Sequence, residues 1–200
     1  SFIKKAGTII LLSTIFVWFT SRFGWLDGQF GMLEEDQISA SILAKIGNAI
    51  CWIFAPLGWG NWQATVASIT GLVAKENIVG TLGVLYSGGA GTVYDAIAAA
   101  FNGITGYSFL VFNLLCAPCF AAIGAIKREM NSPKWTWFAI AYQCGFAYAV
   151  ALMINQFGGL FTGNANIIGV IAAVIVLAAI IYMLVRPYKE ATKLTTKVEM

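Results

Sequence analysis

The sequence has no histidine and few charged residues. The missing histidine removes the most common general base and metal ligand of proteins, which argues against hydrolases and zinc sites. Only 10% of the 200 residues are charged and 59% are hydrophobic, whereas a soluble domain usually has about 25% charged residues. The glycine-rich phosphate loop that ends in Gly-Lys-Ser/Thr is also absent, which excludes nucleotide hydrolysis by that route for these residues. The composition is typical of a membrane protein.

Cysteine is scarce, and its distribution argues against a disulfide framework. The four cysteines, Cys51, Cys116, Cys119 and Cys144, all lie inside apolar segments, whereas disulfide frameworks occur in small secreted domains. A buried free cysteine commonly packs as a small hydrophobic residue. We interpret Cys51 and Cys144 as packing residues of this kind.

Long runs without any charged residue make up most of the chain. They cover residues 6–21, 46–74, 77–94, 96–126 and 136–185. A helix that crosses a bilayer takes about 20 mainly apolar residues, so the last run is long enough for two such helices. The sequence therefore predicts an all-α fold, a polytopic helical membrane bundle.

Hydropathy and helix-breaking residues divide the chain into six segments. In order, we expect a transmembrane helix (1–22), an acidic extracytoplasmic connection (23–41) and a broken or re-entrant gate region (42–105). These are followed by two transmembrane helices with a Pro-Cys motif and a cytoplasmic loop (106–157), a last transmembrane helix (158–186) and a cytoplasmic tail (187–200). Within them, single helices are predicted over residues 107–126, 135–157 and 167–185.

The basic residues predict the orientation of these helices. Short loops rich in Lys and Arg stay in the cytoplasm, which places Lys4, Lys5, the loop 127–134 and the C-terminus on that side. The region 42–86 must then begin and end on the outer side. Because one straight span would break this rule, we expect a broken or re-entrant helix pair that turns near Pro56. Broken helices of this kind are typical of transporter binding sites.

One adjacent ion pair, Lys75–Glu76, interrupts the apolar gate region. A charge at bilayer depth costs roughly 2.5 to more than 10 kcal/mol, so such residues usually face a bundle interior or a polar path. Consecutive helical residues point about 100° apart, so the two charges neutralise each other poorly. Two interpretations remain open. In the first, the pair holds neighbouring helices together or, if the helix is broken there, extends its side chains to the membrane surface. In the second, Glu76 is an oxygen ligand for a cation and Lys75 acts as a gate.

Pro118 interrupts the helix predicted over residues 107–126. Proline removes one backbone hydrogen bond and frees a carbonyl one turn earlier, near Leu114. Cys116 and Cys119 flank the proline on nearly one face of the helix. Freed carbonyls and a thiol suit transient binding of a borderline-soft divalent metal ion. A simple kink packed with small residues is the alternative.

Three stretches resemble the ferrous iron transport protein B (FeoB) family. They are WGNWQATVASITGLVAKENIVGTLGVLY at residues 59–86, FLVFNLLCAPCFAAIGAIKRE at residues 109–129, and KKAGTIILLSTIFVWF at residues 4–19. The resemblance covers nearly the whole chain. It implies the C-terminal part of the membrane domain of a multi-pass inner-membrane Fe²⁺ transporter, including the second gate-like region.

The resemblance also implies roles for single residues. Cys119 corresponds to the gate cysteine that follows a proline in this family, and Lys75–Glu76 corresponds to its Ala-Lys-Glu element. Cys116 departs from the family pattern, because an aromatic residue usually stands there. We therefore expect Glu76, Cys119 and Cys116 as transient ligands of Fe²⁺, Lys75 as the gate, and Pro118 as the helix break.

The family's cytoplasmic N-terminal portion carries a GTPase domain, which we expect to lie outside this sequence. GTP and Mg²⁺ would bind only there, so we expect no catalytic residue and no stably bound cofactor here. The expected partners are the lipid bilayer, Fe²⁺, the GTPase domain with further upstream helices, and small cytoplasmic accessory proteins of the iron system. Nucleic acid is not expected, and a homo-oligomer is compatible with the sequence.

Two other functions remain open on the residues alone. A gate-type transporter of a small organic solute such as a nucleoside would need hydrogen-bonding side chains gathered at the helix break. A non-conducting membrane anchor for a soluble partner would tolerate substitution of Glu76 and Cys119. A membrane enzyme is disfavoured because no pair of nucleophile and base is discernible.

Overall fold

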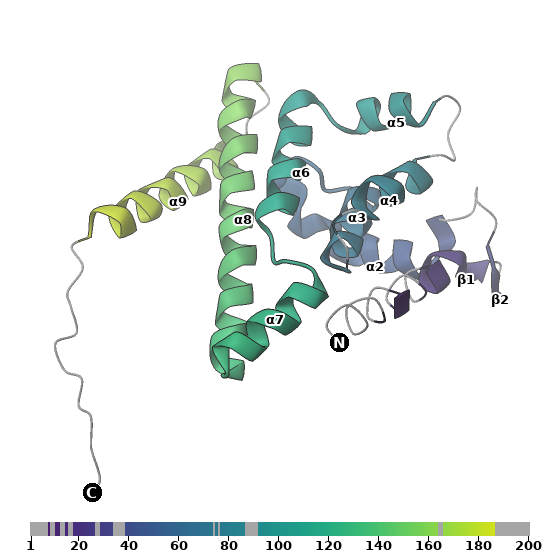
Figure 1. Cartoon of the computed structure of the whole chain (residues 1–200). Coiled ribbons are helices and arrows are strands. Elements are labelled where there is room, and N and C mark those ends of the chain that lie inside the picture. The colour runs from purple at the N-terminus through teal and green to yellow at the C-terminus, as the bar shows by residue number, and fades with distance from the viewer. Residues whose placement is uncertain are drawn as a thin grey trace, which may run out of the picture.

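The computed structural model describes residues 8, 11–12, 15, 18–26, 29–33, 39–73, 75, 77–86, 92–163 and 166–186. Regular structure in these residues is almost entirely helical (Figure 1). The principal helices are α2 (Ile42–Ile50), α3 (Trp62–Val73), α4 (Asn77–Leu85), α5 (Val93–Ala100), α6 (Gly103–Leu115), α7 (Phe120–Met130), α8 (Pro133–Thr162) and α9 (Ile167–Val185). The predicted all-α membrane bundle is confirmed.

A short hairpin is the exception to the helical fold. Strands β1 (Phe23–Leu26) and β2 (Gln29–Met32) pair antiparallel within the segment that we predicted as an acidic connection. Gly24 lets β1 approach the start of α2, because a Cβ atom there would clash with the backbone of Ala40 and Ser41. The acidic residues Asp27 and Glu34–Asp36 lie outside the described residues.

In the part of the chain that the structure describes, two helices are long and apolar enough to cross a bilayer. They are α8, with 30 residues, and α9, with 19. Helices α5 and α6 form a third candidate, but they are bent by 94° relative to each other. Helix α5 ends with Phe101 as its C-cap. Asn102 then caps the start of α6, since its side chain accepts hydrogen bonds from the N–H groups of Ile104 and Thr105. Figure 1 shows α8 as the long upright helix, with α9 leading away from its upper part.

The chain also breaks twice between α2 and α4. The first break holds the two 3₁₀ turns η2 (Cys51–Ile53) and η3 (Ala55–Leu57), and Pro56 lies near the start of η3. Gly58 ends this turn with a left-handed φ of 90°, which favours glycine. The turn predicted near Pro56 is therefore present. The second break lies between α3 and α4, where the structure describes Lys75 but neither Ala74 nor Glu76.

The single helix predicted over residues 107–126 is wrong. The structure has two helices, α6 and α7, separated by residues 116–119, and Cys116 and Cys119 have extended ψ angles of 165° and 160°. Pro118 explains the break, because it lacks an N–H donor and disfavours helical geometry in the residue before it. The prediction for α9 agrees with the structure, whereas α8 begins earlier than predicted, at Pro133, and ends later, at Thr162.

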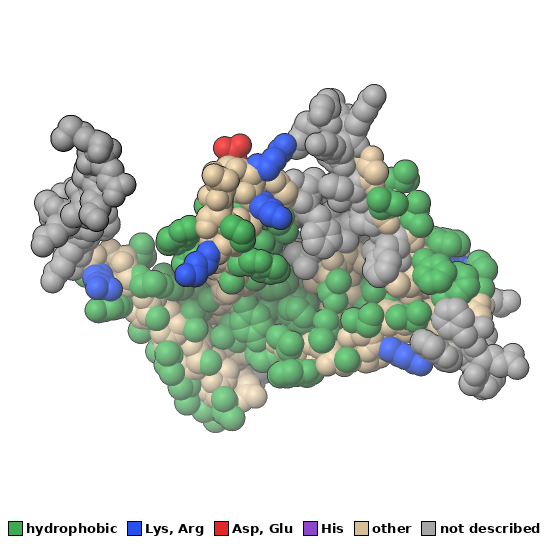
Figure 2. Space-filling view, turned by 90° about the horizontal axis from the view of Figure 1, so that it is seen from below, with side chains coloured by type: hydrophobic (Ala, Val, Ile, Leu, Met, Phe, Trp, Pro, Cys, Tyr) green, Lys and Arg blue, Asp and Glu red, His purple; other side chains and the backbone are tan. Residues whose placement is uncertain are grey.

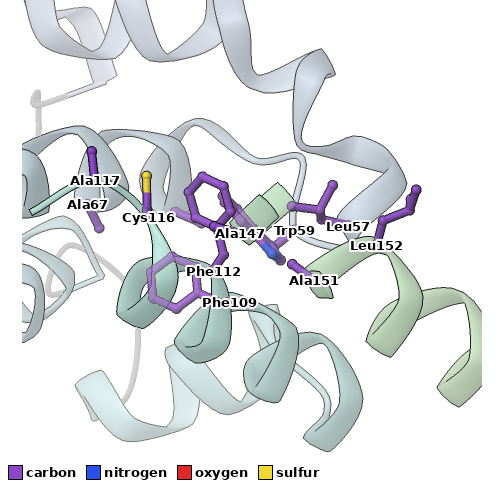
Figure 3. Packing of buried hydrophobic residues seen from close by; sticks show 11 residues of the cluster. Leu57, Trp59, Ala67, Phe109, Phe112, Cys116, Ala117, Ala147, Ala151 and Leu152 are labelled. Atoms are coloured by element: carbon purple, nitrogen blue, oxygen red, sulfur yellow. The ribbon is translucent and has the colours of Figure 1, made fainter. Parts of the chain in front are cut away.

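Aromatic residues and alanines form the core between α3, η3, α6 and α8 (Figure 3). Trp59 is 1% exposed, stacks on Phe54 at a centroid distance of 4.6 Å, and meets the ring of Phe109 edge-on at 5.1 Å. Ala147 and Ala151 let α8 approach this cluster closely. By contrast, most side chains of α9 are exposed, and Figure 2 shows one face broadly covered by hydrophobic side chains. Such surfaces suit contact with lipid or further helices.

Candidate cation site at the α6–α7 break

The C-terminal end of α6 leaves backbone carbonyls without helical partners. Its last hydrogen bond runs from the N–H of Cys116 to the carbonyl of Phe112, at 2.8 Å. The final carbonyls of any helix lack partners from within that helix, and together they carry the negative end of the helix dipole. Because Pro118 prevents continuation into α7, these carbonyls remain without helical partners at the break. The position favours a cation.

Lys75 places its ammonium group at these carbonyls. Its Nζ atom donates to the carbonyl of Leu114 at 3.0 Å and to that of Cys116 at 3.3 Å. Leu114 is the residue whose carbonyl the position of Pro118 is expected to free. Lys75 itself lies in the turn between α3 and α4. Its side chain therefore connects the α3–α4 break to the α6–α7 break. The structure thus brings together three sequence-predicted residues, Lys75, Cys116 and the helix-breaking Pro118.

The other predicted ligands are less closely tied to this position. Glu76 lies outside the described residues. Cys119 is half-buried at the start of α7, and its carbonyl accepts the first hydrogen bond of that helix from Ile123, at 2.9 Å. In the described part of the chain, no three side chains of His, Cys, Asp or Glu gather in one place. Backbone carbonyls are therefore the principal oxygen ligands that the described residues offer at the break.

Cys144 has a partner that sequence reasoning missed. Its Sγ atom on α8 lies 3.5 Å from the Sγ atom of Cys116. The two residues are 28 positions apart in the sequence, and their contact follows from the packing of α6 against α8. No local spacing signals such a contact.

Polar side chains of α8 hold the 3₁₀ turns at the first break. The hydroxyl group of Tyr148 donates to the carbonyl of Ile53 at 2.7 Å. The amide groups of Asn155 and Gln156 both donate to the carbonyl of Pro56, at 3.0 and 2.7 Å. These bonds satisfy irregular backbone, as an apolar environment requires.

A cavity of about 690 Å³ adjoins this turn. It lies between η3, the start of α6, α8 and the start of α9, and its described lining has no charged residue. Its polar lining residues include Asn102, Thr105, Tyr148, Asn155, Gln156 and Asn166. This cavity borders the N-terminal end of α6, whereas Lys75 binds at the C-terminal end.

Comparisons with known proteins identify the family. The model of the Gate family, described as nucleoside recognition, matches residues 3–133. The Fe(2+) transporter FeoB of Methanocaldococcus jannaschii is 40% identical over 162 residues, which are 80% of this chain and 24% of that protein. The corresponding protein of Staphylococcus aureus strain COL is 34% identical over 160 residues, 80% of this chain and 23% of that protein.

A third relative has a composite name. The Fe(2+) transport protein A/Fe(2+) transporter FeoB fusion protein of Porphyromonas gingivalis is 29% identical over an alignment of 203 positions, which covers 80% of this chain and 24% of that protein. This chain thus spans about a quarter of the length of these curated relatives. No solved structure matches. The chain belongs to the Gate family, and its resemblance to FeoB is confirmed.

Proposed function

We propose that this chain is a membrane-embedded part of a ferrous iron uptake transporter and that Fe²⁺ passes the α6–α7 break. The observation that carries the proposal is the position of the Lys75 ammonium on the carbonyls of Leu114 and Cys116. A positive group already occupies the place where the end of α6 attracts a cation. The names of the relatives, which are Fe(2+) transporters, support Fe²⁺ as that cation.

In this mechanism the Lys75 ammonium group occupies the binding position of the transported ion when the ion is absent. With its ammonium group in place, the carbonyls at the break are satisfied and the path is closed. An arriving Fe²⁺ displaces the ammonium and takes over the carbonyl oxygens. Glu76, the next residue in the chain, attracts the ion and balances its charge, and the thiols of Cys119 and Cys116 contribute transient contacts. Fe²⁺ accepts sulfur ligands, whereas Mg²⁺ loses its water reluctantly and prefers oxygen, which gives a basis for selectivity.

The charge pattern supports a multi-pass arrangement in the bacterial inner membrane. Lys127, Arg128 and Lys134 in the α7–α8 connection place that connection in the cytoplasm. Helix α8 then crosses outward and α9 returns, which leaves the C-terminus and the tail 187–200 in the cytoplasm. In this orientation the gate region 42–105 enters from the outer side, and the uncharged cavity beside η3 faces the arriving ion.

Energy coupling belongs to parts outside these residues. We assign no catalytic residue here, and we place GTP hydrolysis with Mg²⁺ in an N-terminal portion of the complete transporter. The fusion of Fe(2+) transport protein A with FeoB in the Porphyromonas relative supports a small cytoplasmic accessory partner. Further membrane helices, and in some arrangements a second copy of the protein, would complete the path.

Uptake of ⁵⁵Fe²⁺ by cells tests the proposal. In the complete transporter, Glu76→Gln and Cys119→Ser should each lower uptake while membrane insertion stays normal. Glu129→Gln and Cys51→Ser are matched controls, because these residues lie away from the break, and they should leave uptake unchanged. Normal uptake in both test variants would remove Glu76 and Cys119 from the path. Competition of uptake by nucleosides would favour an organic solute instead.

A further inference from the structure

Two thiols from different helices meet beside the α6–α7 break. Cys116 follows the last residue of α6 and is buried, and Cys144 lies near the middle of α8 and is half-buried. Their Sγ atoms are 3.5 Å apart, and both cysteines are free. Cys116 lies at the end of the core cluster opposite to Leu57 and Leu152 (Figure 3). The pair is thus at the edge of the packed core.

The distance between the sulfur atoms indicates which ligand chemistry fits. A disulfide requires about 2.05 Å, so the sulfur atoms would have to approach by about 1.5 Å. A metal ion bound linearly through bonds of about 2.3 Å would place them about 4.6 Å apart, whereas tetrahedral binding places them about 3.8 Å apart. The observed 3.5 Å is within about 0.3 Å of the tetrahedral value. We propose that Cys116 and Cys144 form a two-thiolate site for a thiophilic divalent cation of the Zn²⁺ and Cd²⁺ class.

Charge balance favours two thiols over one in this apolar setting. When the ion binds, each thiol releases one proton and becomes a thiolate. The ion brings two positive charges and the two thiolates bring two negative charges, so the net charge of the site remains zero. A single cysteine would leave one uncompensated positive charge, which is costly in a medium of low dielectric constant. Cys51 has no thiol neighbour among the described contacts, so it provides the natural comparison.

A cavity gives the site access and room for further ligands. It has a volume of about 330 Å³, lies between α7 and α8, and is lined by Cys144 together with Ala117, Lys127 and Thr136. Its volume is ample for the water molecules that would complete a tetrahedral site. Lys127 on its lining belongs to the basic α7–α8 connection, so the ion would arrive from that end of the bundle.

Binding at this pair would tie the end of α6 to α8. The same end carries the Cys116 carbonyl that accepts from Lys75 at 3.3 Å. A bound ion would therefore hold the α6–α7 break in its present geometry. The inference does not depend on whether Fe²⁺ is the transported ion, because it is argued from the contact between the Cys116 and Cys144 sulfur atoms.

Titration of the full chain in lipid nanodiscs with Cd²⁺ tests the inference. The absorption of the Cd–thiolate charge-transfer band reports sulfur ligation without any transport. We expect one Cd²⁺ per chain at this site. Cys116→Ser and Cys144→Ser should each weaken binding by more than about 100-fold, beyond the loss typical of residues that merely support ligands. Cys51→Ser should leave both the affinity and the band intensity unchanged.

The controls separate loss of ligation from loss of folding. Cys144→Ala keeps the half-buried position small, and it should also abolish the band while the far-ultraviolet circular dichroism spectrum stays native. Phenylarsine oxide, which bridges two nearby thiols, should compete with Cd²⁺ for the wild-type chain. A full band in Cys144→Ser or Cys144→Ala, an equal loss in Cys51→Ser, or no band in the wild-type chain would overturn the inference.

Discussion

Replacing Lys75 with methionine tests the role of the ammonium group. Methionine keeps an unbranched apolar side chain but cannot donate to the carbonyls of Leu114 and Cys116. Hydrogen bonds from charged groups contribute about 1.5–3 kcal/mol each. Because Lys75 is only partly buried, we take about 0.75 kcal/mol for each bond, half the low end of that range, which makes about 1.5 kcal/mol for the two bonds together. An arriving cation would no longer have to displace this interaction.

The expected result is a tighter cation site. A difference of about 1.4 kcal/mol corresponds to a tenfold change in affinity, so Lys75→Met should bind a divalent cation about tenfold more tightly. Isothermal titration of the full chain in nanodiscs, with Fe²⁺ under anaerobic conditions, measures this affinity. Lys75→Arg retains a positive group and should stay close to the wild type, whereas Lys127→Gln controls for the loss of a charge elsewhere. Equal affinities of Lys75→Met and the wild type would refute the reasoning.

Three further predictions concern the helix breaks. Gln156 is 4% exposed and donates to the Pro56 carbonyl, which also accepts from Asn155. Because that second bond remains, Gln156→Leu should lower the free energy of unfolding by about 0.5–1.5 kcal/mol, the net contribution of one hydrogen bond, measured by denaturant titration in detergent. Gly58→Ala should lower the free energy of unfolding by more than about 1–2 kcal/mol, because φ is 90° and the new Cβ atom would also clash with Asn155. The control is Gly145→Ala, whose new Cβ atom meets nothing within 4 Å and should leave the free energy of unfolding unchanged in the same assay. Pro118→Ala should let helix form across residues 116–119, and spin-label distances between α6 and α7 would then lengthen; unchanged distances would show that the proline does not cause the break.

The sequence predicts those elements that local chemistry determines. Helix α9 has the expected bounds because 19 apolar residues lie between a capping residue, Asn166, and a charged one, Arg186. The turn at Pro56 and the free carbonyl near Leu114 follow from the missing N–H of proline and its effect on the preceding residue. The family follows from contiguous motifs. Each of these features is contained in a short stretch of chain.

Features that depend on tertiary packing could not be predicted in the same way. The contact between Cys116 and Cys144, and the two amide groups on the Pro56 carbonyl, both require α8 to lie beside segments far away in the sequence. Pro118 suggested a kink, but whether a proline bends or ends a helix depends on what satisfies the exposed carbonyls. Here the Lys75 ammonium from another helix break does so.

The most direct test of the account is the position of Fe²⁺ in crystals of the complete transporter, located by anomalous scattering at the iron absorption edge. The account predicts an iron peak within bonding distance of the carbonyl oxygens of Leu114 and Cys116, with the Lys75 ammonium moved away from both. An iron peak elsewhere in the bundle, with Lys75 still bound to these two carbonyls, would contradict it.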